Sequence, residues 1–184
     1  NKAKSQSDGY RLKRLTAEDY FYRAFNAPVQ NIQYIIDNYS ESIRMNPELA
    51  AAHINRGCAF EDKGMYREAL NDYTSAIEIS PDNDKAYNNR GRLLVEVFKK
   101  YQLAMDDYNN AIKLNPNNIE AYNNRGVFYK LFDGTENLAI KDFNKAISLD
   151  INFAAAYCNR GTVYAKSSIK KYNLALADFN KAIE

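Results

Sequence analysis

Four asparagine side chains recur at a constant spacing and could bind a peptide main chain. They are Asn55, Asn89, Asn124 and Asn159, and successive members are 34, 35 and 35 residues apart. An amide side chain carries both hydrogen-bond donors and an acceptor, so it can pair with a peptide backbone whatever the side chains of that peptide are. Each such bond would contribute about 0.5–1.5 kcal/mol net. We call these four residues the asparagine row.

The segments around the asparagine row repeat as well. AYNNRG at 86–91 returns unchanged at 121–126 and as AYCNRG at 156–161. The block ALNDYTSAI (69–77) recurs as AMDDYNNAI (104–112), AIKDFNKAI (139–147) and ALADFNKAI (175–183). Several landmarks that share one period of 34 to 35 residues indicate an array of structural repeats.

Each repeat is predicted to contain two helices. In the second half, apolar side chains follow helical spacing at Ala69, Leu70, Tyr73, Ala76 and Ile77. In the first half the same is true of Tyr87, Gly91 and Leu94 and of their equivalents. Gly is a poor helix former, so its recurrence indicates close approach of the two helices.

The asparagine row lies two positions before each glycine of the first helix. At about 100° per residue, this position points roughly 165° away from the buried stripe. We therefore expect the four side chains to face outward, and packing alone does not explain why they recur. Asn88 and Asn123, three positions before the glycines, lie on the helix flank and are weaker candidates.

The order aromatic, Arg-Gly, aromatic or Leu, Ala, Tyr or Phe, Ala and Pro resembles the tetratricopeptide repeat (TPR) family. The resemblance implies an all-α, right-handed superhelix of antiparallel helix pairs, an α-solenoid. Five repeats are predicted at about 16–49, 50–83, 84–118, 119–153 and 154–184. The first is degenerate and the last is truncated inside its second helix, so we expect a fragment of a longer protein. Residues 1–15 are predicted to be a basic polar linker.

In a TPR solenoid the first helices line the concave surface, which would make the asparagine row the floor of a groove. The row resembles the asparagine ladder of the TPR superhelix in O-linked N-acetylglucosamine transferase. The predicted peptide-binding residues are Asn55, Asn89, Asn124, Asn159, Lys85 and Arg92. The alternative is that the asparagines were copied by duplication without a role. A chaperone carboxylate clamp does not fit, because Phe21, Phe25 and Asn89 occupy three of its places.

Other recurrent polar residues indicate scaffold roles. Arg56, Arg90, Arg125 and Arg160 precede the glycines, and Asp72, Asp107, Asp142 and Asp178 precede the aromatic residues of the second helices. These sets predict an Arg–carboxylate bond between helices in four repeats. The first repeat, with Arg23 and Asn38, would have a weakened version. His53 replaces a Tyr and is predicted to be a packing residue. Longer turns at 98–102, 132–137 and 167–173 are ascribed to loop drift, and a second contact surface is the alternative.

The composition contains few candidates for catalysis or cofactor binding. The chain has one His, no Gly-rich phosphate loop, and two cysteines, Cys58 and Cys158, which are 100 residues apart and predicted to be reduced. We therefore expect neither an enzyme nor a cofactor or metal site. The net charge of +2 divides into +4 for residues 1–15 and −2 for the remainder. Because cations and anions balance on the predicted groove, we do not expect a nucleic-acid partner.

The predicted function is a protein–protein interaction scaffold that binds an extended peptide or a partner helix in the concave groove. One alternative is a substrate-recruiting arm of a larger enzyme such as a glycosyltransferase. Another is self-association through Leu174, Leu176 and Phe179, which have no following repeat to cover them. No apolar run approaches the roughly 20 residues of a membrane span, and we expect a cytoplasmic location. Because the chain starts at Asn1 without Met, we expect the native terminus to be missing.

Overall fold

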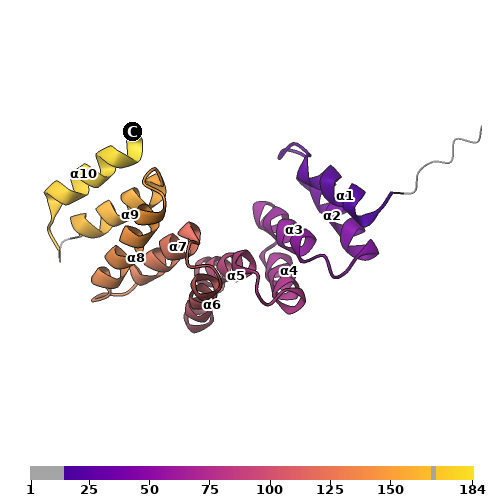
Figure 1. The fold of residues 1–184 in the computed structure, drawn as a ribbon, viewed down its shortest axis with the longest axis horizontal. Helices are drawn as coiled ribbons and strands as arrows, with labels where there is room; N and C mark the ends of the chain where they lie inside the picture. The colour runs from indigo at the N-terminus through magenta and orange to yellow at the C-terminus, as the bar shows by residue number, and fades with distance from the viewer. Residues whose placement is uncertain (1–14, 167–168) are drawn as a thin grey trace, which may run out of the picture.

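A computed structural model describes residues 15–166 and 169–184, and these residues form ten α-helices. The helices are α1 (Ala17–Phe25), α2 (Ile32–Met45), α3 (Ala50–Asp62), α4 (Tyr66–Ile79), α5 (Asp84–Glu96), α6 (Tyr101–Leu114), α7 (Ile119–Tyr129), α8 (Glu136–Leu149), α9 (Ala154–Ala165) and α10 (Tyr172–Ile183). The predicted all-α solenoid is confirmed (Figure 1). The predicted basic linker lies outside the described residues except for Leu15.

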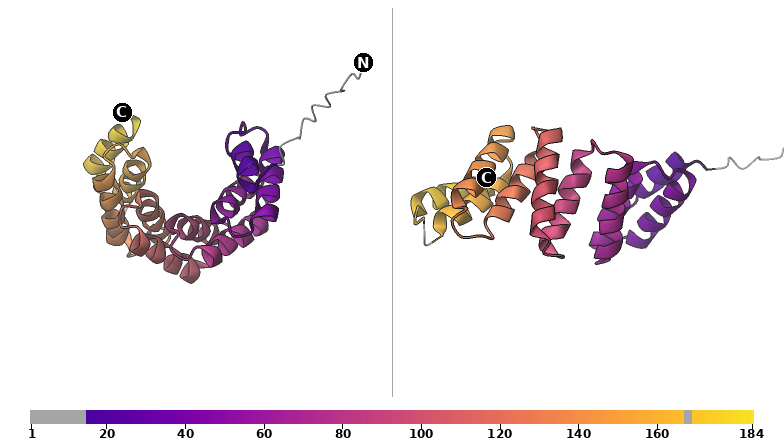
Figure 2. Two further views of the ribbon diagram at one scale, coloured as in Figure 1. Left: turned by 45° about the vertical axis from the view of Figure 1, so that its right-hand side comes forward. Right: turned by 90° about the horizontal axis from the view of Figure 1, so that it is seen from below.

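Consecutive helices pack as antiparallel pairs, and each pair packs against the next. The pairs follow a U-shaped arc, best seen in the left view of Figure 2. The first helices of neighbouring pairs also contact each other directly, α5 with α7 and α7 with α9. These direct contacts place the odd-numbered helices on the inner, concave side of the arc.

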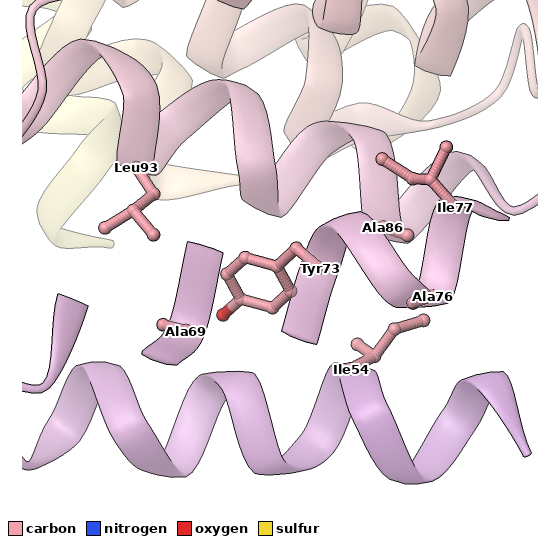
Figure 3. Packing of buried hydrophobic residues seen from close by; sticks show 7 residues of the cluster. All are labelled: Ile54, Ala69, Tyr73, Ala76, Ile77, Ala86 and Leu93. Carbon is pink, nitrogen blue, oxygen red and sulfur yellow. The ribbon is translucent and has the colours of Figure 1, made fainter. Parts of the chain in front are cut away.

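In the last four helix pairs the core is an aromatic side chain of the second helix packed against a glycine of the first, whereas in the first pair Ala24 takes the place of the glycine and packs with Tyr39. Figure 3 shows the ring of Tyr73 among Ile54, Ala69 and Leu93. The rings of Tyr73 and Phe143 are fully buried. A Cβ atom added at Gly57 would lie 2.7 Å from Cε1 of Tyr73. The recurrent glycine is therefore required by close packing, as its position in the helical stripe predicts.

The predicted Arg–carboxylate bonds are present in four repeats. The arginine Nε and Nη2 atoms donate to both carboxylate oxygens at 2.6–2.9 Å in the pairs Arg56–Asp72, Arg90–Asp107, Arg125–Asp142 and Arg160–Asp178. In the first repeat Asn38 instead donates to the carbonyl of Tyr34 in its own helix. Such bidentate bonds are among the strongest hydrogen bonds in proteins.

The same arginines also connect neighbouring repeats, a contact that the spacing within one repeat does not predict. Each Nη1 atom donates to a side-chain oxygen two positions after the aspartate, or its counterpart, in the preceding repeat. The acceptors are Ser40 for Arg56, Thr74 for Arg90, Asn109 for Arg125 and Asn144 for Arg160. Each arginine therefore holds its own helix pair together and fixes that pair against the preceding one.

His53 is a buried packing residue with both ring nitrogens engaged, as predicted. Nδ1 lies 3.2 Å from Oδ1 of Asp72, and Nε2 lies 3.1 Å from the carbonyl oxygen of Pro47. Burial opposes ionisation of Asp72, but hydrogen bonds from Arg56 and His53 outweigh it and hold the pKa of this carboxyl below its ordinary value. His53 therefore helps to stabilise the Arg56–Asp72 pair.

Two of the longer turns contain a lysine with positive φ. Lys99 has φ of 55° in the turn between α5 and α6, and Lys170 has φ of 52° between α9 and α10. This conformation is uncommon for residues other than glycine. Residues 167 and 168 of the last turn lie outside the described residues.

Candidate functional site on the concave face

The asparagine row lies on the first helices, and each of its amides contacts the preceding repeat. The amide nitrogen of Asn124 donates to Oδ1 of Asn88 at 3.0 Å, and that of Asn159 donates to Oδ1 of Asn123 at 3.1 Å. Asn89 lies within 3.7 Å of Sγ of Cys58. Burial raises the pKa of the Tyr39 phenol, and a hydrogen bond from Asn55 opposes that shift.

The expectation that packing does not explain the asparagine row is therefore wrong. All four side chains are half-buried, and they join consecutive repeats. The angle around the helix takes account of only the two helices of one repeat. The first helix of the neighbouring repeat covers the side of the helix that faces away from the buried stripe. Only the array as a whole shows this contact.

Asn88 and Asn123 are more important than their flank position suggested. Both are buried, at 2% and 8% exposure, and each accepts the amide of the next repeat. A sequence signal for this role exists. The first asparagine of each Asn-Asn doublet, Asn88 or Asn123, accepts the bond from the row asparagine of the next repeat. In the other two repeats that carry a row asparagine, Ile54 and Cys158 take the position of this first asparagine.

These amides form a continuous chain of polar groups along the inner face from α5 to α9. Nζ of Lys130 donates to Oδ1 of Asn159 at 3.1 Å, and Nδ2 of Asn123 lies 3.5 Å from Oδ1 of Asn124. Burial lowers the pKa of the Lys130 ammonium group. A primary amide has two N–H donors and two acceptor lone pairs, and the bonds from Asn124 and Asn159 to the preceding repeat each use one of these N–H groups.

The two predicted cationic residues differ in their surroundings. Arg92 binds both oxygens of Glu61 through Nη2, at 2.8 and 2.9 Å, and Glu96 through Nη1 at 3.1 Å. Lys85 is exposed on the first turn of α5. The charge of Arg92 is therefore largely compensated, and that of Lys85 remains open to solvent.

Two adjacent hollows open on the N-terminal half of the concave face. We call the first the acidic hollow; it measures about 640 Å³, and its lining includes Cys58, Glu61, Asp62, Arg92 and Glu96. We call the second the apolar hollow; it measures about 240 Å³, and its lining includes Phe25, Val29, Ile32, Ile35 and Tyr39. Cys58 and Asp62 line both hollows, so the two are neighbours.

A third hollow of about 370 Å³ lies at the C-terminal half, lined by Lys130, Glu136 and Lys166 among others. Nζ of Lys166 binds Asp133 at 2.8 Å and Glu136 at 2.9 Å. This end of the concave face is thus less acidic than the N-terminal end.

Within the described part of the chain, no group of three or more His, Cys, Asp or Glu side chains could hold a metal ion. Cys58 is half-buried and Cys158 exposed, both with free thiols as predicted, and burial raises the pKa of Cys58. None of the described helices is both long and apolar enough to cross a membrane.

Family models and solved structures match the chain. Models described as tetratricopeptide repeat match residues 50–83 and 119–152, and one described as TPR repeat matches 99–131. MamA 41-end from Desulfovibrio magneticus RS-1 superposes with a TM-score of 0.73 at 19% identity, covering 91% of this chain and 93% of that one. TTC0263 of Thermus thermophilus, a thermophilic TPR protein, gives a TM-score of 0.76 at 16% identity, covering 91% of this chain and 90% of that one.

The structure of YrrB, described as a TPR protein with an unusual peptide-binding site, has a TM-score of 0.65 at 25% identity, covering 91% of this chain and 84% of that one. The helix pairs, the recurrent glycine–aromatic contacts and these matches agree with one another. The chain is a tetratricopeptide repeat protein.

Proposed function

We propose that this chain is a protein-interaction scaffold and that an extended segment of a partner lies along its odd-numbered helices. The main chain of that segment would pair with Asn55, Asn89, Asn124 and Asn159. The observation that carries the proposal is the set of hydrogen bonds that fixes each amide against the preceding repeat. An amide held in place loses little side-chain entropy when a ligand binds, so its bond contributes more to affinity.

Two further points support a binding role. YrrB, a structural neighbour at 25% identity, is described as having a peptide-binding site. Lys85 supplies an exposed cation at the N-terminus of α5 for a carboxylate of the partner, whereas Arg92 would act through Glu61 and Glu96. The scaffold proposal requires no catalytic group.

We expect the double variant Asn89→Ala and Asn124→Ala to lose the protein partners that the unaltered array captures from a lysate. Two or more main-chain hydrogen bonds would be lost, at about 1 kcal/mol each, which corresponds to roughly thirtyfold weaker binding. Affinity capture with quantitative mass spectrometry measures this loss, after circular dichroism shows equal helicity.

The matched control is Asn109→Ala with Asn144→Ala. These two asparagines also accept a bond from the next repeat, through Arg125 and Arg160, but they lie on the second helices. The control loses the same number of contacts between repeats and should keep its partners. If both double variants retain every partner, the asparagine row does not bind them and the proposal is wrong.

A second candidate function is self-association through α10. Leu174, Leu176 and Phe179 are 48%, 60% and 37% exposed on this helix. Either a second copy or a following helix could cover these side chains. Light scattering over a hundredfold range of concentration should show a rise in mass that Leu174→Glu with Leu176→Glu abolishes. A constant monomer mass would exclude this candidate.

A substrate-recruiting arm of a larger enzyme would use the same concave face. The full reading frame distinguishes that alternative from a free-standing scaffold, because it shows whether a catalytic domain is attached.

A further inference from the structure

The acidic hollow carries an excess of negative charge, because its lining has more carboxylates than cations. Three carboxylates and one guanidinium line it, which gives a net charge of −2. Glu61 is fully engaged, since it accepts from Arg92 and from the hydroxyl of Tyr73. Glu96 binds Arg92 through one oxygen and its side chain is 57% exposed. Asp62 is exposed at the C-terminus of α3.

The apolar hollow next to it exposes large hydrophobic side chains. Phe25 is 63% exposed and Val29 is 78% exposed, and both lie at or just after the end of α1. Ile32, Ile35 and Tyr39 of α2 also line it. Exposed apolar side chains that line a concavity often mark a binding site.

We propose that the N-terminal half of the concave face, from α1 to α5, binds a partner segment that carries an apolar side chain next to lysine or arginine. The apolar side chain fills the apolar hollow, and the cation lies between Asp62 and Glu96. This inference rests on the proposed function and adds the chemical class of the partner. Because Asp62 lines both hollows, adjacent residues of one segment reach the two hollows together.

Charge complementarity favours a cationic partner over an anionic one. In the acidic hollow, an acidic segment or a phosphate would meet a net charge of −2, and the guanidinium of Arg92 on its lining already binds two carboxylates. A cationic side chain would gain from Asp62 and from the second oxygen of Glu96. Such half-exposed pairs determine specificity and association rate more than affinity.

The test uses three fluorescein-labelled peptides and fluorescence anisotropy with the full chain. The peptides are Gly-Gly-Leu-Lys-Lys-Leu-Gly-Gly, a version with both lysines changed to glutamate, and a version with both leucines changed to alanine. We expect the first to bind at least about tenfold more tightly than either of the others, and its binding to weaken as salt is raised. Equal binding of the lysine and glutamate peptides would overturn the proposal.

Variants of the chain locate the binding. Asp62→Asn with Glu96→Gln should weaken binding of the lysine peptide about three- to tenfold, from two half-exposed ion pairs. The control pair Glu78→Gln with Asp106→Asn removes the same charge from α4 and α6 and should have no effect beyond about twofold. Phe25→Ala with Val29→Ser should weaken binding without unfolding the chain, because both side chains are already exposed. If the Asp62 and Glu96 variant binds as the unaltered chain does, the proposal fails.

Residues 1–14 contain Leu12, Lys13 and Arg14, so the test must also distinguish this segment of the chain from a segment of a partner. If the lysine peptide binds only after Arg11→Ser, Lys13→Ser and Arg14→Ser are introduced, the chain's own N-terminal segment occupies this face, and a partner segment does not. A different result would contradict the proposed function, namely that the double variant Asn89→Ala and Asn124→Ala captures the same partners as the unaltered chain. Asparagine-dependent capture without a preference for lysine would overturn only the inference about partner chemistry.

Discussion

Asp72→Ala will lower the free energy of unfolding by about 3 kcal/mol, because it leaves the half-buried Arg56 guanidinium without its partner. Asp72 accepts two bonds from Arg56 and one from His53, and its side chain is only 6% exposed. The cost lies at the lower end of the range for buried pairs, since the Arg56 side chain is 20% exposed. Urea unfolding followed by circular dichroism measures it.

The same variant has a predictable dependence on pH. The pKa of Asp72 in the folded chain lies below its ordinary value of 3.8. A carboxyl with a lowered pKa contributes stability that is present above the pKa of the unfolded chain and is lost as pH falls through the folded value. The difference between the unaltered chain and Asp72→Ala should therefore shrink below about pH 4.

Asp106→Ala serves as the control for this prediction. Asp106 is exposed and accepts one bond from Gln102 within α6. We expect its effect to stay within about 0.5 kcal/mol, which is usual for surface sites. A loss below about 1 kcal/mol for Asp72→Ala would show that Arg56 finds other partners or water, and that the pair contributes little.

The sequence was sufficient to predict three features that depend on one helix pair. The Gly–aromatic contact, the Arg–Asp bonds and the buried role of His53 all follow from the spacing of residues within a repeat. Each involves residues that are 16 to 19 positions apart in the sequence and therefore belong to the same repeat. Periodicity therefore sufficed for the fold and for its internal bonds.

The contacts between repeats could not be predicted from this periodicity. The bond from Asn124 to Asn88 spans 36 residues, and the bond from Asn159 to Asn123 spans the same number. Which outward side chain meets which neighbour depends on how one pair is rotated against the next, and no local periodicity encodes that rotation. The hollows around Asp62 were hidden for the same reason, since their walls come from three successive repeats.

Two rows of polar side chains hold the repeats in register. The arginines connect successive pairs through the second helices, and the asparagines do so through the first. Since stability in a solenoid is approximately a sum of repeat and interface contributions, each row affects the curvature of the concave face as well as the free energy of unfolding. The asparagines that would contact a ligand therefore also determine the shape of the surface to which it binds.

Gly126→Ala will destabilise the chain by about 2 kcal/mol, because the new methyl group overpacks a rigid aromatic contact. Its Cβ would lie 2.5 Å from Cε1 and 2.8 Å from Cδ1 of Phe143, a ring that is fully buried. Alanine is the better helix former by about 1 kcal/mol, so the clash must exceed this gain. Thermal and urea unfolding measure the net change.

Gly161→Ala provides the sharpest comparison. Its Cβ would lie 2.8 Å from Cε1 of Phe179 and 3.2 Å from the carbonyl oxygen of Ala175, but Phe179 is 37% exposed and is therefore less confined than the fully buried Phe143. We expect this variant to be less destabilising than Gly126→Ala. Adding Phe143→Leu to Gly126→Ala should recover at least about 1 kcal/mol relative to the sum of the single changes, as expected for residues in contact. Strict additivity in this cycle would mean that the ring of Phe143 is not what requires a glycine on α7.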